Sequence, residues 1–305
     1  IYTEQLKGLV LAPGVIGVGH NLSGNRVENQ FTPMANVEWD LNPRTMLYAS
    51  ATSGYKAGGF DGRANNPYSF EFEDEKAIAY EIGAKNYLFD RTLELNVDYF
   101  YTDYRNLQVS QFDGVFGFNV GNAKKARTQG IELDGRWAIT DAWTLAYSYA
   151  WLDFRFTDFQ NGNCYDGQVP NGVTLSNGVH MCDYSGETGQ YSPKNSAALS
   201  LDYKRALDSR WLMTGSLMYN FRGSEQIHDN HDPRMQQPGV GRIDLRIGIE
   251  DKNWRLAFIG KNLANEKVLS YAGNVPLTYS LFGTNTYFAF VERPRQLALD
   301  VSYSF

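Results

Sequence analysis

Apolar and polar residues alternate along many segments of the chain, and the last segment shows this alternation most clearly. Every second residue between 297 and 305 is apolar or aromatic: Leu297, Leu299, Val301, Tyr303 and Phe305. The residues between them are small or polar. A period of two predicts a β-strand with one apolar face and one polar face. We therefore expect the chain to end in an amphipathic strand.

The same alternation recurs through most of the chain. Between 92 and 110, for example, Leu95 and Val97 alternate with Glu94 and Asn96. Glycines interrupt residues 1–32 without a clear period, so a long loop is expected there. We predict about eleven strands, at 33–40, 45–56, 76–88, 92–110, 123–139, 143–157, 193–204, 211–224, 241–250, 254–263 and 293–305.

The connections between these strands alternate between short and long. Roughly two to four residues join one pair and roughly ten to thirty-five residues join the next. A membrane barrel sorts its connections in this way, because short turns lie on one rim and long loops on the other. The predicted strands also exceed the five or six residues that are usual in soluble sheets. The pattern predicts an all-β fold, an antiparallel up-and-down transmembrane β-barrel.

Charged residues of the clear strands fall on the polar faces, as Glu81, Asp98, Glu132 and Arg246 do. An arginine or lysine on a lipid-facing surface costs about 2–4 kcal/mol at the bilayer midplane. The distribution therefore predicts a polar barrel interior. A soluble all-β binding protein is the alternative, but it needs a second layer over the apolar faces. The sequence predicts no helix that would cover them.

Composition narrows the classes of function. The net charge of −6 and the absence of a basic stripe argue against nucleic acid as a partner. Aromatic residues make up 14% of the chain, which suits the aromatic girdles of a membrane barrel. No run of 18 apolar residues predicts a transmembrane helix. Cys164 and Cys182 lie in one polar segment, where we expect a disulfide; two free thiols are the alternative.

Several stretches resemble the C-terminal half of TonB-dependent outer-membrane receptors of the siderophore type. The matches follow the order and spacing of that family over nearly the whole chain. The final amphipathic strand, with its terminal phenylalanine, is also similar to the signal read by the barrel-assembly machinery. The similar stretches are 45–50, 53–60, 80–85, 130–134, 261–267 and 293–305.

The resemblance implies a 22-stranded barrel with a plug domain inside it, in the outer membrane of a Gram-negative bacterium. It implies outer-membrane lipid as the surroundings, a ferric siderophore or a similar scarce nutrient as the ligand, and the TonB energy-transduction complex as a partner through the plug. No plug is found in this sequence, so we expect strands 12 to 22, with residues 1–32 as an extracellular loop and 33–305 as the strands. The alternative is a complete small barrel, a passive channel or surface hydrolase, with a further strand near 9–18.

Candidate chemistry is confined to the loops. The segment His228-Asp-Asn-His231-Asp232 could bind a metal ion, because histidine and carboxylate side chains at this spacing can converge; a solvated polar loop is the alternative. No nucleophile lies in a recognisable hydrolase setting, so we expect no enzyme activity and no resident cofactor or metal. Loop aromatic residues could stack on a ligand or pack the loops together. The candidates for ligand contact are Tyr68, Phe112, Phe116, Tyr184, His228, His231 and Arg234.

Overall fold

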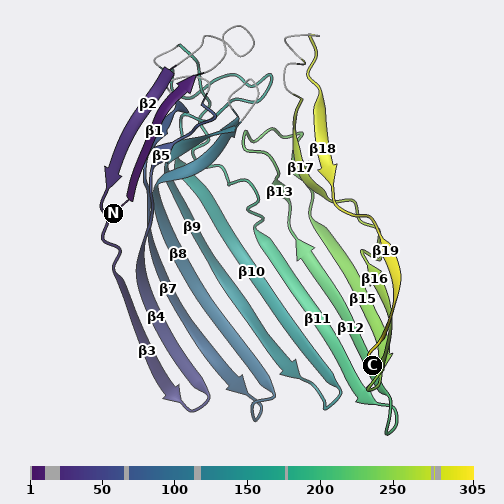
Figure 1. Ribbon diagram of the computed structural model, residues 1–305. Helices are drawn as coiled ribbons and strands as arrows, with labels where there is room; N and C mark the ends of the chain where they lie inside the picture. The colour runs from purple at the N-terminus through teal and green to yellow at the C-terminus, as the bar shows by residue number, and fades with distance from the viewer. Residues whose placement is uncertain are drawn as a thin grey trace.

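The computed structural model describes residues 2–10, 21–64, 69–112, 118–175, 178–275, 278 and 283–305. Its main feature is an antiparallel sheet of eleven strands, in the order β19-β16-β15-β12-β11-β10-β9-β8-β7-β4-β3 (Figure 1). The strands are β3 (Met34–Asn42), β4 (Thr45–Lys56), β7 (Glu75–Leu88), β8 (Leu93–Phe112), β9 (Phe118–Ala138), β10 (Trp143–Asp158), β11 (Asn195–Ala206), β12 (Leu212–Arg222), β15 (Val240–Glu250), β16 (Trp254–Lys261) and β19 (Gln296–Tyr303).

Each predicted strand corresponds to one strand of this sheet, and the predicted all-β antiparallel architecture is confirmed. The largest difference lies at β8 and β9, where a loop was predicted from about 111 to 121. The two strands instead continue to Phe112 and Phe118, which face each other in the register. Glycine and asparagine residues hide the alternation of this stretch, while the ladder extends because both strands remain paired. Phe112 therefore ends a strand instead of lying in a loop.

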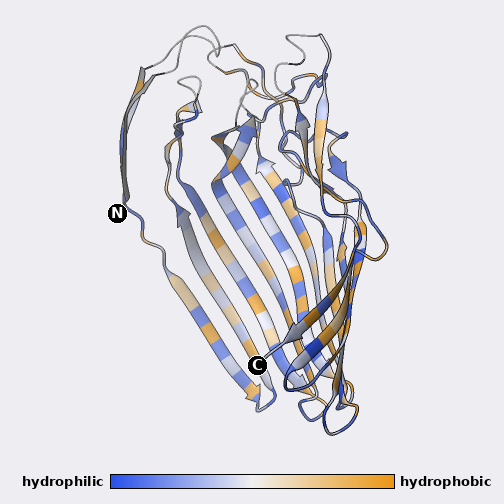
Figure 2. Ribbon diagram, turned by 45° about the vertical axis from the view of Figure 1, so that its right-hand side comes forward, coloured by the Kyte–Doolittle hydropathy of each residue, from blue (hydrophilic) through white to orange (hydrophobic). Residues whose placement is uncertain are grey.

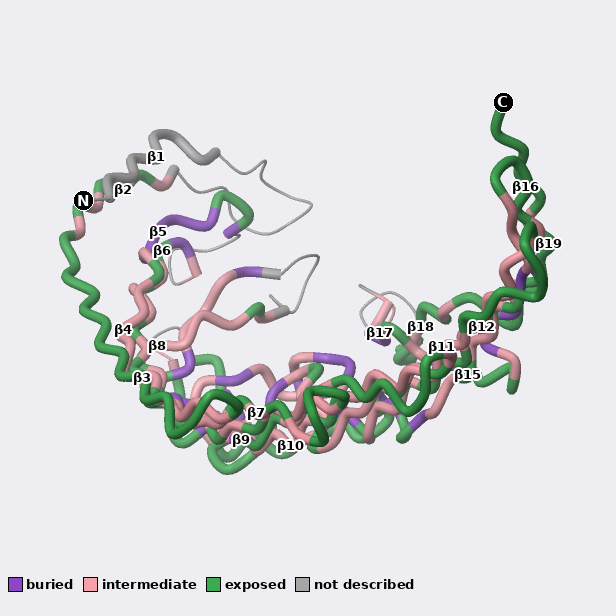
Figure 3. Tube along the Cα trace, turned by 90° about the horizontal axis from the view of Figure 1, so that it is seen from below, coloured by how far each residue is buried: buried purple, intermediate pink, exposed green. Residues whose placement is uncertain are grey.

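The sheet is strongly curved and open (Figure 3). Strands β3 and β19 form its two ends and are not paired with each other. The described strands thus form part of a barrel wall, not the closed small barrel considered as an alternative. Hydropathy alternates along the strands as the sequence predicts (Figure 2). Among the described residues, no helix is long and apolar enough to cross a membrane.

The packing of the loops identifies the two faces of the sheet. Several loop segments lie on the concave side of the sheet (Figure 3). Ala126 of β9 and Phe156 of β10 pack against Phe159 and Tyr184, which belong to a loop on the concave side. The even-numbered side chains of β9 and β10 therefore face the concave side. Glu132 is also an even-numbered residue of β9 and points to the same side, so the polar face of the sheet is the concave face.

The convex face carries the apolar side chains, and these are widely exposed in the chain alone. Leu299 is 80% exposed, although its type is normally buried in a folded protein. No second layer of the described residues covers this face. Its exposed members include Val37, Trp39, Ile78, Ile82, Val97, Ile131, Leu199, Leu217, Ile243, Ile247, Leu297, Leu299, Val301 and Tyr303.

The first 32 residues differ from the loop without regular structure that the sequence predicted. Strands β1 (Tyr2–Val10) and β2 (Asn21–Glu28) form an antiparallel pair, separate from the large sheet. Arg26 of β2 forms ion pairs with Glu28, Glu71 and Glu73, which hold the hairpin near β6 (Glu71–Phe72). Gly8 and Gly24 interrupt the alternation of apolar and polar residues in this segment, so the sequence pattern did not indicate two strands. The extracellular position of this segment remains a prediction.

Three other short pairs belong to the long connections. They are β5 (Gly59–Phe60) with β6, β13 (Glu225–Gln226) with β14 (Gln236–Gln237), and β17 (Leu269–Asn274) with β18 (Tyr287–Val291). These pairs gather at one end of the large sheet, opposite the short turns (Figure 1). This end, which we call the loop rim, therefore holds almost all of the irregular structure.

Candidate ligand-binding rim

Two loops and one hairpin meet at the loop rim. We call residues 159–194 the disulfide loop, residues 223–239 the histidine loop, and β17 with β18 the rim hairpin. The sheet brings them together because β10 precedes the disulfide loop and β12 precedes the histidine loop, with only β11 between those two strands. Interactions among the three segments, described below, form one connected cap.

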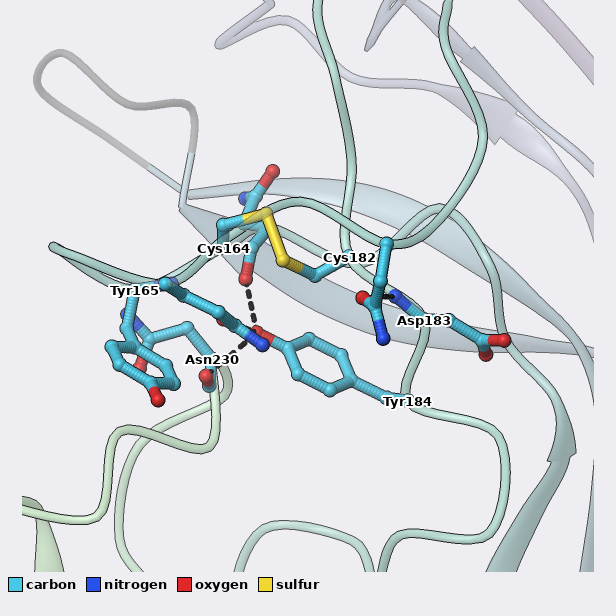
Figure 4. The surroundings of a disulfide bond; sticks show 9 residues. Cys164, Tyr165, Cys182, Asp183, Tyr184 and Asn230 are labelled. Carbon is cyan, nitrogen blue, oxygen red and sulfur yellow. Dashed lines mark hydrogen bonds between the residues drawn. A yellow bond between two sulfur atoms is a disulfide. The ribbon is translucent and has the colours of Figure 1, made fainter.

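The disulfide between Cys164 and Cys182 lies at the centre of the disulfide loop (Figure 4). Cys182 is fully buried, and main-chain hydrogen bonds pair it with Gly162 in both directions. Phe156 and Phe159 belong to the same apolar cluster. The covalent link and this cluster together fix the base of the loop against the tops of β9 and β10.

Tyr184 connects the disulfide loop to the histidine loop. Its hydroxyl group lies 2.5 Å from the main-chain oxygen of Asn163 and 2.7 Å from that of Asn230 (Figure 4). The side-chain oxygen of Gln168 also lies 3.1 Å from this hydroxyl, and the Tyr184 side chain is only 3% exposed. Burial raises the pKa of the Tyr184 hydroxyl well above its ordinary value, so the group stays protonated and able to donate.

His231 packs against the other side of this junction. Its imidazole ring stacks on the ring of Tyr184, with centroids 4.5 Å apart, and meets the Phe156 ring at a steep angle. Burial lowers the pKa of His231 below its ordinary value, since the charged form loses hydration. The residue also has a positive φ of 54°, a left-handed conformation that is uncommon for residues other than glycine.

His228 lies on the hairpin side of the histidine loop. Its Nδ1 atom is 2.8 Å from Oδ1 of Asn230, and its ring centroid is 5.7 Å from that of Tyr271 on β17. His228 is 3% exposed and His231 is 9% exposed. The segment is thus a buried polar turn, whereas the sequence offered a solvated loop or a metal site.

Asp232 and Arg234 hold the turn that follows. Asp232 is fully buried, and both of its carboxylate oxygens accept hydrogen bonds from the Arg234 guanidinium group. The same guanidinium group lies 4.5 Å from the ring centroid of Tyr287 on β18 and donates to the main-chain oxygen of Asp166. These hydrogen bonds to the Asp232 carboxylate raise the pKa of Arg234 above its ordinary value. Arg234 therefore links all three segments of the cap.

The rim hairpin has further contacts with both loops. The Asn274 amide donates to the Asp166 carboxylate at 2.5 Å, and the Tyr191 hydroxyl donates to the main-chain oxygen of Ser270 at 2.9 Å. An apolar cluster of Ile227, Met235 and Ala272 fills the space between the histidine loop and the hairpin. The cap is accordingly packed internally with both polar and apolar contacts.

Below the cap, the concave wall carries paired charges around a hollow of about 440 Å³. Arg222 forms ion pairs with Glu225 and Glu292, and Arg242 also pairs with Glu292. On the other side of the hollow lie Glu132 and Asp134. The concave surface is therefore polar and of mixed charge, as predicted from the strand pattern.

The structure brings four of the predicted ligand-contact residues together, namely Tyr184, His228, His231 and Arg234. Tyr68 and Phe116 lie outside the described residues, and of Phe112 only the backbone is described. Among the residues that the structure describes, no group of three or more His, Cys, Asp or Glu side chains is arranged to hold a metal ion. Contact with a ligand remains a prediction for all of these residues.

Of the residues that organise the cap, Tyr287 was not found by sequence reasoning, and Asn230 and Asp232 were named only as part of a candidate metal-binding segment. One signal was available for Asp232. The spacing Asp-Pro-Arg at 232–234 is typical of a turn in which the aspartate accepts from the residue two positions on, and the main-chain nitrogen of Arg234 does donate to Asp232 at 2.9 Å. Nothing local marks Tyr287, because its partner Arg234 lies far away in the sequence.

Comparison with known families agrees with this architecture. The family model described as "TonB dependent receptor-like, beta-barrel" matches residues 10–263. The chain belongs to this family. The recognition made from the sequence motifs is thereby confirmed, as is the assignment to an all-β barrel wall.

Two proteins described as siderophore receptors share part of the sequence. The ferric-pyoverdine M114 receptor PbuA of Pseudomonas sp. (strain M114) is 25% identical over 287 residues, which is 90% of this chain and 30% of that protein. The probable TonB-dependent siderophore receptor PiuA of Acinetobacter baumannii is 32% identical over 137 residues, 43% of this chain and 18% of that protein. The chain thus spans less than a third of the length of these relatives.

Solved structures of TonB-dependent receptors have the same fold. The ferric yersiniabactin uptake receptor FyuA from Yersinia pestis superposes with a TM-score of 0.71 at 18% identity, over 95% of this chain and 39% of that one. The siderophore receptor PiuA from Acinetobacter baumannii superposes with a TM-score of 0.68 at 19% identity, over 96% and 38% of the two chains. At these identities the likeness establishes the fold alone.

Proposed function

We propose that this chain forms part of the barrel wall and the outer loops of an outer-membrane receptor that imports a ferric siderophore or a similar scarce nutrient. The observation that carries the proposal is the match of residues 10–263 to the receptor family. The curved sheet, with an apolar convex face and its loops gathered on one rim, supports it. In this role the wall spans the lipid, and the cap contacts the ligand.

The surroundings follow from the same physical argument. An exposed apolar convex face is stable where hydrocarbon covers it, and together with the family this supports a location in the outer membrane of a Gram-negative bacterium. The polar concave face then surrounds the receptor's interior, where a plug domain and its partner, the TonB energy-transduction complex, drive uptake. The barrel-assembly machinery inserts the wall. The function is transport, without enzyme activity in this chain.

The experiment uses the complete receptor that contains this chain. It is expressed in a Gram-negative strain that lacks its own siderophore receptors, and uptake of radioactive iron bound to pyoverdine or to yersiniabactin is measured. We expect accumulation that depends on the receptor and stops when the energy-transduction complex is disrupted. Correctly inserted receptor without any uptake of these or other ferric siderophores would contradict the proposal.

A second candidate substrate class is a metal complex other than iron. A metal-pseudopaline receptor from Pseudomonas aeruginosa is 26% identical over 225 residues, which is 73% of this chain and 28% of that protein. The same uptake assay with nickel, zinc and copper complexes separates the two classes. Uptake of one of these metals in place of iron would support this candidate.

A further inference from the structure

Basic side chains occupy the end of the convex face nearest the loop rim on β7 to β10. Lys76 of β7 lies opposite Arg105 of β8, which in turn lies opposite Lys125 of β9. Arg127 of β9 and Arg155 of β10 lie opposite each other one row nearer the short turns. Opposite residues of an antiparallel pair share a face, and the odd-numbered residues of β9 face the convex side. We call these five residues the basic rim patch.

Aromatic and apolar rows lie directly below this patch on the convex face. Tyr80 and Tyr101 lie opposite each other in the next row toward the short turns, and Ile82 and Tyr99 form the row after it. Tyr80 is 51% exposed and Ile82 is 59% exposed in the chain alone. Aromatic residues of a membrane barrel mark the boundary between hydrocarbon and head groups. In a bilayer, the basic rim patch therefore lies at the level of the lipid head groups on the loop side.

Carboxylates balance only part of the charge of the patch. Arg127 and Arg155 share the carboxylate of Asp153, with nitrogen–oxygen distances of 3.8 Å and 3.0 Å. Lys76 pairs with Asp74 at 2.9 Å, and half of the Lys76 side chain remains exposed. Because two guanidinium groups share one carboxylate, this part of the patch keeps a net positive charge.

Arg105 and Lys125 carry the least compensated charge of the patch. Both side chains are exposed, and in the described parts of the chain neither forms an ion pair with a carboxylate. Together with Ser53, Asp103 and Thr157 they line a hollow of about 420 Å³. Among the described residues that line it, Asp103 is the single acidic one, whereas three are basic. An anion that enters this hollow therefore meets a surplus of positive charge.

The basic side chains are concentrated on one part of the wall. The convex residues nearest the loop rim on β11, β12 and β15 are Asn195, Phe221 and Gly241, which carry no charge. A general attraction of cations to the membrane surface would favour lysine and arginine at any point of the rim. Their concentration on β7 to β10 favours a ligand that binds at a defined position.

We propose that the basic rim patch binds the head group of a membrane glycolipid that carries two phosphate groups. Neighbouring strands are about 4.8 Å apart, so the patch extends over about 10 Å from Lys76 to Lys125. One phosphate group cannot span that distance, whereas two phosphates on one sugar head group can. Guanidinium groups bind phosphate through two parallel hydrogen bonds. Ser53 and Thr157 offer hydroxyl groups to the sugar, and the acyl chains lie over Ile82.

The test titrates the complete receptor in detergent with lipids and measures the bound fraction by native mass spectrometry. The probes are lipid A with two phosphates, its dephosphorylated form, cardiolipin and phosphatidylglycerol. We expect lipid A with two phosphates to bind at least about tenfold more tightly than each of the other three. Each cation near a charged lipid surface contributes roughly fivefold in affinity, so Arg105→Gln together with Lys125→Gln should weaken this binding about twentyfold.

Arg205→Gln is the matched control. Arg205 is an exposed cation on the convex face of β11, near the short turns, and its replacement should leave lipid binding unchanged. Heat-modifiable mobility on gels shows that each variant is assembled. A measurement without any variant is the effect of salt on the wild-type receptor. Raising NaCl from about 0.1 M to about 0.5 M should weaken the binding of lipid A, because salt screens exposed charges.

Equal affinity for lipid A and its dephosphorylated form overturns the proposal, as does equal affinity for cardiolipin. Unchanged binding to the double variant, an equal loss in Arg205→Gln, or binding that does not respond to salt also overturns it. The inference rests on the proposed location in the membrane, but no transport is measured. A receptor that binds the lipid and imports no siderophore therefore contradicts only the proposed function, and one that imports without binding the lipid contradicts only this inference.

Discussion

The imidazole ring of His231 stacks on the phenol ring of Tyr184, with centroids 4.5 Å apart and ring planes inclined by 24°. The two residues belong to different loops, which leave the sheet at β10 and β12. Their contact therefore fixes the position of the histidine loop relative to the disulfide loop. This junction is one of the contacts that hold the cap together, and its chemistry can be tested.

Replacing Tyr184→Phe should loosen the junction without changing the sheet. The substitution keeps the ring stack but removes the only hydroxyl that hydrogen-bonds to the buried main-chain oxygen of Asn230 in the described structure. We expect the free energy of local opening of residues 223–239 to fall by about 1–3 kcal/mol. Hydrogen exchange in the complete receptor measures this opening. Tyr219→Phe, on the convex face, is the matched control and should have no effect on the cap.

Removing the disulfide should expose the disulfide loop to proteases. The bond closes a loop between residues 18 positions apart, for which chain entropy predicts about 3 kcal/mol of stabilisation. In a receptor with Cys164→Ser and Cys182→Ser together, cleavage within 159–194 should be faster, while the short turn at 89–92 serves as an internal control. Unchanged cleavage in both segments would show that the loop is held by packing alone.

The two faces of β11 should respond differently to a positive charge. Leu199 lies on the convex face and is 43% exposed, whereas its neighbour Ser200 lies on the concave face. We expect Leu199→Arg to cost about 2–4 kcal/mol and to reduce the amount of assembled receptor in the membrane. Ser200→Arg should be tolerated, because the concave face is polar. Heat-modifiable mobility on gels reports assembly for both variants.

Acid should open the cap through His231. Because burial lowers the pKa of His231, the unfolded loop binds the proton more readily than the folded loop does. The stability that neutral His231 contributes to the cap is therefore fully present above the ordinary histidine pKa of about 6.5 and is lost as the pH falls below that value. Hydrogen exchange of residues 223–239, compared at each pH with His231→Phe, isolates this contribution.

The charges that face His231 determine how large this acid effect is. Asp229 and Glu187 favour the protonated ring, while His228 opposes it. Burial outweighs both carboxylates in the direction of the shift. If the difference between wild type and His231→Phe does not grow as the pH falls from 7 to 5, the imidazole is solvated and the packing described here is wrong.

The strands could be predicted because the alternation that indicates each strand lies within the strand's own residues. In β19 the alternation of Leu297, Leu299 and Val301 with polar neighbours defines both the strand and its faces. Short turns such as Asp251–Asn253 then fix the register of adjoining strands, as β15 and β16 show. Each strand carries its own signal, so no knowledge of distant residues is required. The curvature and the polar concave face follow once all strands share this pattern.

The cap was predictable only in part. Aromatic and histidine residues could be named as candidates, but their arrangement depends on contacts between segments far apart in the sequence. Tyr184 meets Asn230 across 46 positions, and Arg234 meets Asp166 across 68. No local pattern encodes such pairs. The strand pairs β1–β2 and β17–β18 were missed because Gly8, Gly24 and Gly273 interrupt the alternation of β1, β2 and β17, and because β18 is only five residues long.

The central claim is that hydrocarbon covers the convex face, and nitroxide labels on β19 test it most directly. In the complete receptor reconstituted in lipid, Leu299→Cys places a label on the convex face and Ala298→Cys places one on the concave face. The account predicts that the label at 299 is more accessible to oxygen than to a water-soluble nickel complex. The label at 298 should be less accessible to oxygen than that at 299. Equal access of the nickel complex to both positions would contradict the account, as would burial of residue 299 against another protein layer.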